Sequence, residues 1–99
     1  MPAYQRLEVT EVGDVAVVRF RSRRIVDDVD IQEIGSEMFS LVESDKRMKL
    51  LLNFSTVDFL GSAALGKLIT LDKKMKAQGG KLKLSNIKPE IYEVFASRS

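Results

Sequence analysis

The chain has 99 residues, 44% of them hydrophobic and 30% charged, which is the composition of one small globular domain. It contains no cysteine and no histidine, which excludes disulfides, thiol catalysis, thiolate or imidazole metal sites and serine–histidine hydrolysis. The net charge is only +2, but residues 1–48 carry seven basic and ten acidic side chains, whereas residues 49–99 carry nine and four. We expect a single cytoplasmic domain over residues 1–99 without a secretion signal.

The chain begins with a pattern that predicts a β-hairpin. Apolar residues alternate with polar ones over residues 4–12, which indicates a half-exposed strand. Val15–Phe20 is apolar enough to lie inside a sheet. Gly13 and Asp14 separate the two runs, as in a hairpin with a tight turn. The arginine-rich segment 21–24 that follows is too polar to be buried, and we expect it to be a loop.

Helical spacing of apolar residues then predicts a helix from about residue 29 to residue 44. The residues that carry this spacing are Ile31, Ile34, Met38 and Leu41. Asp27 and Asp28 lie at the start, where carboxylates cap free amides and favour the positive end of the helix dipole. Gly35 is expected to let the helix pack closely against the sheet.

The second half of the chain predicts a strand, a helix and another strand. Leu50–Leu52 is a short apolar run of the kind found in central strands. A loop over residues 54–61 leads to a helix over residues 62–78, which Gly79 and Gly80 end. Residues 81–84 alternate as a strand.

A last short helix is predicted from Pro89, because proline is tolerated at the first helical position. Ile91, Val94 and Phe95 are expected to point inward. The full order is β-β-α-β-α-β-α, which predicts an α/β domain with a mixed sheet and helices packed against it.

The segment 57–66 carries the functional signal, because a buried strand gives way here to a loop and then to the start of a helix. Ser62 can use its hydroxyl to cap the first-turn amides. It can equally accept a phosphate, which a helix N-terminus favours. The small neighbours Gly61, Ala63 and Ala64 leave this hydroxyl accessible to a partner's active site.

These residues resemble the STAS domain family, which includes anti-sigma factor antagonists and the cytoplasmic tails of sulfate transporters. The usual signature is Asp-Ser-Ser/Thr-Gly-Leu-Gly at a strand-to-helix turn, and Ser62, Leu65 and Gly66 match it. Residues 79–84 also match the family's Gly-Gly-x-Leu-x-Leu. The resemblance covers about residues 5–95. In this chain Gly61 and Asn53 replace two common aspartates, and Ala63 and Ala64 replace the second hydroxyl residue and the first glycine.

The resemblance implies a regulator rather than an enzyme, with no cofactor of its own. It implies partner switching, in which unphosphorylated protein binds an anti-sigma factor that is also a serine kinase of the histidine-kinase-like ATPase type. Phosphorylation of Ser62 would end that interaction, and a phosphatase would restore it. The chain is expected to be a monomer or weak homodimer without nucleic-acid or membrane partners. The expected contact residues are Asp27, Asp28, Asp58, Gly61, Ser62, Ala63, Ala64 and Lys67.

Two alternatives remain open at this point. Gly61 in place of aspartate is compatible with a scaffold module that needs no phosphorylation. The basic second half is compatible with a small nucleic-acid-binding domain, whose affinity would fall steeply with salt. The cluster Arg21, Arg23 and Arg24 is interpreted as a solvated loop rather than a phosphate site, since no aromatic residue interrupts it.

Overall fold

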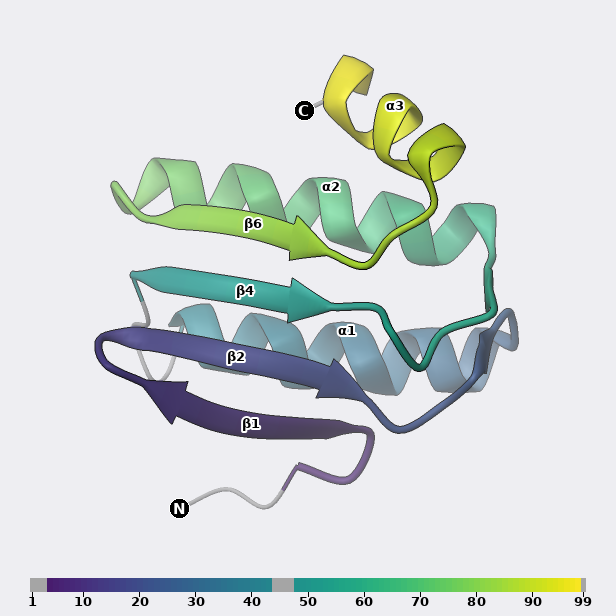
Figure 1. The fold of residues 1–99 in the computed structure, drawn as a ribbon, viewed down its shortest axis with the longest axis horizontal. Coiled ribbons are helices and arrows are strands. Elements are labelled where there is room, and N and C mark those ends of the chain that lie inside the picture. Colours follow the sequence, from purple (N-terminus) through teal and green to yellow (C-terminus); the bar gives the residue numbers. More distant parts are fainter. Residues whose placement is uncertain (1–3, 44–47, 99) are drawn as a thin grey trace.

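The computed structural model describes residues 4–43 and 48–98, in which four strands form the main sheet (Figure 1). The strand order is β1 (Leu7–Val12), β2 (Val15–Phe20), β4 (Lys49–Asn53) and β6 (Lys81–Ser85). β1 and β2 pair antiparallel, and the turn between them contains Gly13 with a φ of 62°. β2 pairs parallel with β4, and β4 pairs parallel with β6. The predicted hairpin and mixed sheet are confirmed.

Two long helices cover one face of this sheet. α1 (Asp28–Glu43) and α2 (Ser62–Ala77) lie together behind it, and α3 (Pro89–Arg98) lies beside β6 at the sheet edge (Figure 1). Asp27 directly precedes α1, where its carbonyl accepts a hydrogen bond from the amide of Ile31 at 2.9 Å. Residue 44, the expected end of this helix, lies outside the described residues. In the described part of the chain, no helix has the length and apolar character needed to cross a membrane.

The core lies between these helices and the sheet. Alternate residues of the central strands are buried there because side chains along a strand point to opposite faces. These residues are Ala16, Val18, Phe20, Leu50 and Leu52. The apolar stripe predicted for the first helix packs onto them and is confirmed as buried: Ile31, Ile34, Met38 and Leu41 of α1. α2 adds a buried stripe of its own: Ala64, Leu68, Leu71 and Met75.

The other face of the sheet points to the viewer in Figure 1, and no helix in the described residues covers it. Val15, Val17 and Leu51 are half-buried on this face. Three lysines of β4 and β6 lie next to these aliphatic residues. The register places them there, because Leu51 pairs with Lys83 and Lys49 pairs with Lys81. This surface therefore has an aliphatic centre and a basic margin.

A second, two-stranded parallel sheet was not expected from the sequence. β3 (Arg24–Ile25) pairs with β5 (Phe59–Leu60), so Arg24 and part of segment 54–61 are strand rather than loop. Ile25 is buried and anchors this small sheet in the core. The pairing brings the chain before α1 against the chain before α2.

Two further expectations are corrected. Gly35 does allow a close approach, but the neighbour is α2 rather than the sheet, since a Cβ at Gly35 would lie 3.2 Å from Cδ of Lys67. Val94 is 38% exposed instead of pointing inward, whereas Phe95 is buried and Ile91 is half-buried. The predicted stop of α2 is confirmed, with Gly79 at a φ of +78°.

Candidate functional site

The candidate site is the surface around the start of α2, where β3 and β5 hold two distant segments together. The Gly61 amide donates to the Ile25 carbonyl at 2.9 Å. The amides of Asp58 and Phe59 both donate to the Arg23 carbonyl, at 2.7 and 3.2 Å. The loop before α1 therefore lies directly beside the loop that leads to Ser62.

Ser62 is the first residue of α2 and is exposed. Gly61 is the N-cap residue, in an extended conformation and without a side-chain cap hydrogen bond, so the interpretation of Ser62 as the N-cap is wrong. The first-turn amides of an α-helix have no partner within the helix. Among the residues that the structure describes, the Ser62 hydroxyl has no hydrogen-bond partner. It lies at the positive end of α2, whose first turn contains no acidic residue.

Gly61 is placed where a side chain is tightly restricted. A Cβ at this position would lie 3.3 Å from the Ile25 carbonyl oxygen and 3.5 Å from Cα of Val26. Its φ of −74° is accessible to any residue. The space taken up by β3, rather than the backbone conformation, is what favours glycine here.

The charged side chains beside the site are partly engaged with one another. The Asp58 carboxylate accepts a hydrogen bond from Nε of Arg23 at 3.1 Å and forms an ion pair with Nη2 of the same side chain at 3.0 Å. The side chains of Arg23 and Asp58 are 74% and 52% exposed, so this pair contributes little to stability. Asp58 is therefore held toward β3 by its partner.

Exposed apolar side chains on the same segments were missed by the sequence reasoning. Phe59 is 54% exposed, with the Arg24 guanidinium 4.6 Å and the Lys88 ammonium 5.5 Å from its ring centroid. Val26 and Val29 are also exposed. We call Val26, Val29 and Phe59 the apolar patch. Apolar residues in a segment otherwise rich in charge were the available signal. Aromatic residues and arginine, such as Phe59 and Arg24, are enriched in protein interfaces.

The remaining predicted contact residues divide into exposed and covered ones. Asp27, Asp28 and Ala63 are exposed. Lys67 is half-buried, and its ammonium lies 5.9 Å from the centroid of the Phe39 ring. Ala64 is only 5% exposed and belongs to the core, so it cannot contribute directly to a contact surface.

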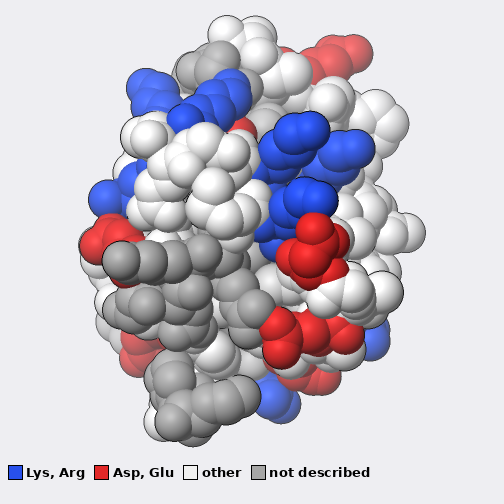
Figure 2. All heavy atoms as spheres, turned by 90° about the vertical axis from the view of Figure 1, so that its left-hand side faces the viewer, with Lys and Arg blue, Asp and Glu red and all other residues white. Residues whose placement is uncertain are grey.

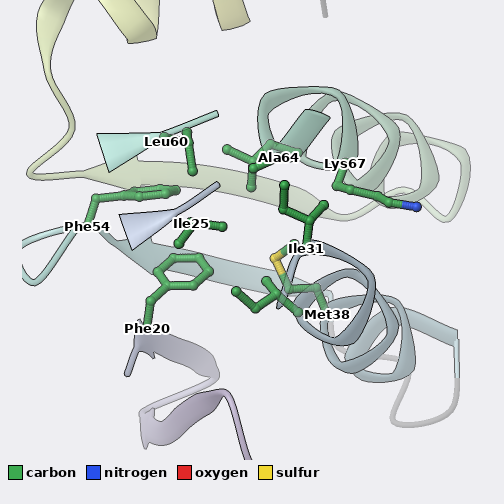
Figure 3. A pocket seen from close by; sticks show the side chains of 10 residues that line it. Phe20, Ile25, Ile31, Met38, Phe54, Leu60, Ala64 and Lys67 are labelled. Atoms are coloured by element: carbon green, nitrogen blue, oxygen red, sulfur yellow. The ribbon is translucent and has the colours of Figure 1, made fainter. Parts of the chain in front are cut away.

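The interior beneath the site is filled by side chains. Figure 3 shows residues from β3, β5, α1 and α2 converging there, with Phe20 and Phe54 together at one end. The two phenyl rings are 4.8 Å apart between centroids, and the cavity that remains is about 10 Å³. That volume is close to one water molecule. This cavity therefore has no room for a ligand larger than a water molecule.

The family model of the STAS domain matches residues 6–97. The chain belongs to the STAS domain family. The predicted relationship is thereby confirmed over almost the whole sequence, including both the β3–β5 pair and the start of α2. Within this STAS domain, Ser62 begins α2 directly after β5 and Gly61.

Solved structures share the same fold at low sequence identity. The anti-sigma factor antagonist SpoIIAA in its unphosphorylated form is 19% identical, with a TM-score of 0.74 over 91% of this chain and 81% of that chain. SpoIIAA from Bacillus in its phosphorylated form is 18% identical, with a TM-score of 0.73 over 92% of this chain and 81% of that chain. RsbS of Moorella thermoacetica is 17% identical, with a TM-score of 0.73 over 96% of this chain and 79% of that chain. The predicted fold class, a compact α/β domain with an N-terminal hairpin, is confirmed by these likenesses.

A similar domain also occurs inside a much larger protein. The murine Slc26a9 anion transporter matches 89% of this chain at 19% identity and a TM-score of 0.66, but this match spans only 14% of the transporter. The same fold is thus present in a separate regulator and as one part of a membrane transporter.

Proposed function

We propose that this STAS domain is an anti-sigma factor antagonist that acts by partner switching, with Ser62 as the phosphoacceptor. The observation that carries the proposal is the placement of Ser62, which is exposed, has no N-cap role and directly follows Gly61, whose position lies against Val26 of the apolar patch. The likeness to SpoIIAA, a protein solved in both phosphorylated and unphosphorylated forms, adds support. Its partner would be an anti-sigma factor that is itself a serine kinase of the histidine-kinase-like ATPase type.

The chemistry requires only a hydroxyl from this chain. The Ser62 oxygen attacks the γ-phosphorus of the kinase's ATP, and the bond from that phosphorus to the bridging oxygen of the β-phosphate breaks. ADP leaves, and the hydroxyl proton passes to a base of the kinase. The domain is therefore a substrate and regulator in this reaction, while magnesium, ATP and catalysis come from the partner.

The switch follows from the charge that the phosphate adds. A phosphoserine carries about −1.5 to −2 charges at pH 7. The free amides at the start of α2 tolerate this charge within the domain. A partner surface shaped to receive a neutral hydroxyl and the apolar patch would instead have to desolvate a dianion, so the complex would dissociate.

The proposed contact surface extends over three neighbouring segments. Its centre is Phe59 with Ser62, and the loop before α1 lies on one side because β3 pairs with β5. The polar and small members are Asp27, Asp28, Asp58, Gly61, Ala63 and Lys67, and the buried Ala64 is left out. A phosphatase that removes the phosphate would need access to the same turn, and the setting would be the bacterial cytoplasm.

Phosphopeptide mass spectrometry on the protein from its native cells tests the phosphoacceptor. Trypsin leaves Ser62 in the peptide 50–67, which also contains Ser55 and Thr56, so fragment ions must separate the three hydroxyls. We expect phosphate on Ser62 whose occupancy changes between growth and stress. Absence of phosphate under every condition, with full coverage of this peptide, would overturn the switch.

Co-purification then tests the partner. We expect the wild type and Ser62→Ala to retain the kinase and Ser62→Asp to lose it. Ser36→Asp is the matched control, because Ser36 is exposed on α1 and the substitution adds the same charge elsewhere. Equal retention by both aspartate variants would contradict partner switching.

A scaffold that works without phosphorylation is the second candidate. The observation that favours it is Gly61, which replaces the aspartate usual beside the acceptor serine and has little room for a side chain. The likeness to one part of a large transporter is compatible with it. Stable partner binding by Ser62→Asp, together with an unphosphorylated Ser62, would favour this candidate.

A further inference from the structure

A hollow on the uncovered face of the sheet lies away from the Ser62 surface. It has a volume of about 340 Å³ and is lined by Val15, Lys49, Leu50, Leu51, Lys81 and Lys83. This volume is within the range of small-molecule sites, which begins at about 300 Å³. Val15 and Leu51 are half-buried and form an aliphatic floor, while the three lysines are exposed and form the margin.

The lysines lie close together because the strand register places them so. Lys49 and Lys81 are directly paired across β4 and β6, and neighbouring strands are about 4.8 Å apart. Lys83 is two residues farther along β6 and on the same face, a separation of about 6.6 Å. Like charges at such positions are destabilising.

This repulsion is only partly relieved within the domain. Lys49 donates to the Asp14 carboxylate at 2.7 Å, and in the described part of the chain neither Lys81 nor Lys83 has an ion-pair partner. The formal charges of the three lysines and Asp14 sum to +2. Figure 2 views the end of the sheet where β4 and β6 begin, and basic side chains gather there above a group of acidic ones.

We propose that this hollow binds a small soluble phosphate monoester with a short aliphatic portion. The monoester carries close to two negative charges at neutral pH, which matches the two uncompensated positive charges. Its phosphate would lie between the Lys81 and Lys83 ammonium groups, and its aliphatic portion would cover Val15 and Leu51. The lysine stems add further apolar surface, because they extend along such a ligand while their ammonium groups remain hydrated.

The proposal is tested by NMR titration of the ¹⁵N-labelled full chain with hexyl phosphate, methyl phosphate and inorganic phosphate at constant ionic strength. Hexyl phosphate should give saturable shifts at the amides of Val15, Leu51, Lys81 and Lys83. Burial of part of its chain should make it bind about tenfold more tightly than methyl phosphate. Raising the salt concentration should weaken the binding of all three.

The decisive variant is the double substitution of Lys81→Gln and Lys83→Gln, compared with Lys73→Gln on the far side of α2. Loss of two charge-assisted contacts should weaken hexyl phosphate binding at least about tenfold. The Lys73→Gln control removes a charge from another exposed lysine and should bind like the wild type. A double variant with Lys81→Arg and Lys83→Arg keeps both positive charges. In the same titration it should retain most of the wild-type affinity for hexyl phosphate.

Several results would overturn the proposal. One is equal binding by the double variant and the wild type, and another is a set of shifts spread evenly over all surface lysines. Co-sedimentation with phosphatidylglycerol vesicles without binding of hexyl phosphate would assign the face to a bilayer instead. Concentration-dependent dimerisation that the double variant abolishes, again without hexyl phosphate binding, would assign it to a second copy of the chain.

Discussion

Gly61 and Ile25 are joined so closely that the same carbonyl oxygen both accepts the Gly61 amide at 2.9 Å and limits its side chain. A Cβ on Gly61 would lie 3.3 Å from that oxygen. The β3 backbone therefore bears directly on the residue before Ser62. This contact explains why a residue without a side chain suits the position where the family usually has aspartate.

Gly61→Ala should lower the free energy of unfolding by about 1–2 kcal/mol, because β3 must shift and alanine is a poor N-cap. Gly61→Asp should cost less, since an aspartate N-cap recovers about 1 kcal/mol. Urea denaturation measures both. Gly66→Ala is the control, because nothing lies within 4 Å of its Cβ, and it should stabilise by about 0.5–1 kcal/mol. A Gly61→Ala domain as stable as the wild type would contradict the crowding.

Gly35 and Gly80 should respond to alanine in opposite directions. At Gly35 the nearest atom is Cδ of the flexible Lys67 at 3.2 Å, so the better helix propensity should prevail by about 0.5–1 kcal/mol. At Gly80 a Cβ would lie 2.8 Å from the Met48 carbonyl oxygen, and the backbone there cannot yield cheaply. Thermal unfolding should show a higher Tm for Gly35→Ala and a lower one for Gly80→Ala. Changes of the same sign would refute this distinction.

Glu37 on α1 should be a larger source of stability than a surface carboxylate. It accepts hydrogen bonds from the amides of Gln5, Arg6 and Leu7, at 3.1–3.2 Å, and so holds the start of β1. Glu37→Ala should lower the free energy of unfolding by about 1–3 kcal/mol. Glu33→Ala, which removes a partly exposed pair with Arg6, should cost less than about 1 kcal/mol. Chemical denaturation measures the free energy of unfolding of both variants. Equal decreases in the two would contradict the stabilising role of the hydrogen bonds that Glu37 accepts.

Asp14 should titrate below its ordinary pKa of 3.8, chiefly because its carboxylate accepts a hydrogen bond from Lys49. A lowered pKa means that this interaction stabilises the folded state fully above pH 3.8 and is lost as the pH falls through the lowered pKa. Carboxyl-carbon NMR titration measures it directly. Lys49→Gln should raise the Asp14 pKa toward its ordinary value, whereas Lys73→Gln should not. An unchanged Asp14 pKa in Lys49→Gln would exclude Lys49 as the cause.

The main sheet and both long helices could be predicted because their signals are local. Val15–Phe20 has the composition of a central strand, and the spacing of Ile31, Ile34, Met38 and Leu41 defines a helix face. The pair Gly79 and Gly80 marks the end of α2, where Gly79 takes a positive φ that favours glycine. Each of these patterns lies within a few residues of the chain, so no knowledge of distant partners was needed.

The surroundings of Ser62 could be predicted only in part. The turn itself has a recognisable sequence, but β3 and β5 contain two residues each and carry no periodicity. These strands form because Ile25 is buried in the core and because the Gly61 amide donates a hydrogen bond to the Ile25 carbonyl. Both are contacts between residues far apart in the sequence. The exposure of Phe59 depends in turn on this pairing. The hollow on the sheet face was likewise hidden, because only the register between β4 and β6 brings Lys49 beside Lys81.

The shortness of the β3–β5 pair has a consequence for how the serine is presented. Two residues per strand supply few hydrogen bonds, and much of the surrounding surface is exposed. Segments of this kind open at a free-energy cost well below that of global unfolding. Amide protons of Asp58, Phe59 and Gly61 should therefore exchange with solvent faster than those of β2 and β4. Opening of this pair would release the residues that lead into Ser62, while the four-stranded sheet stays intact.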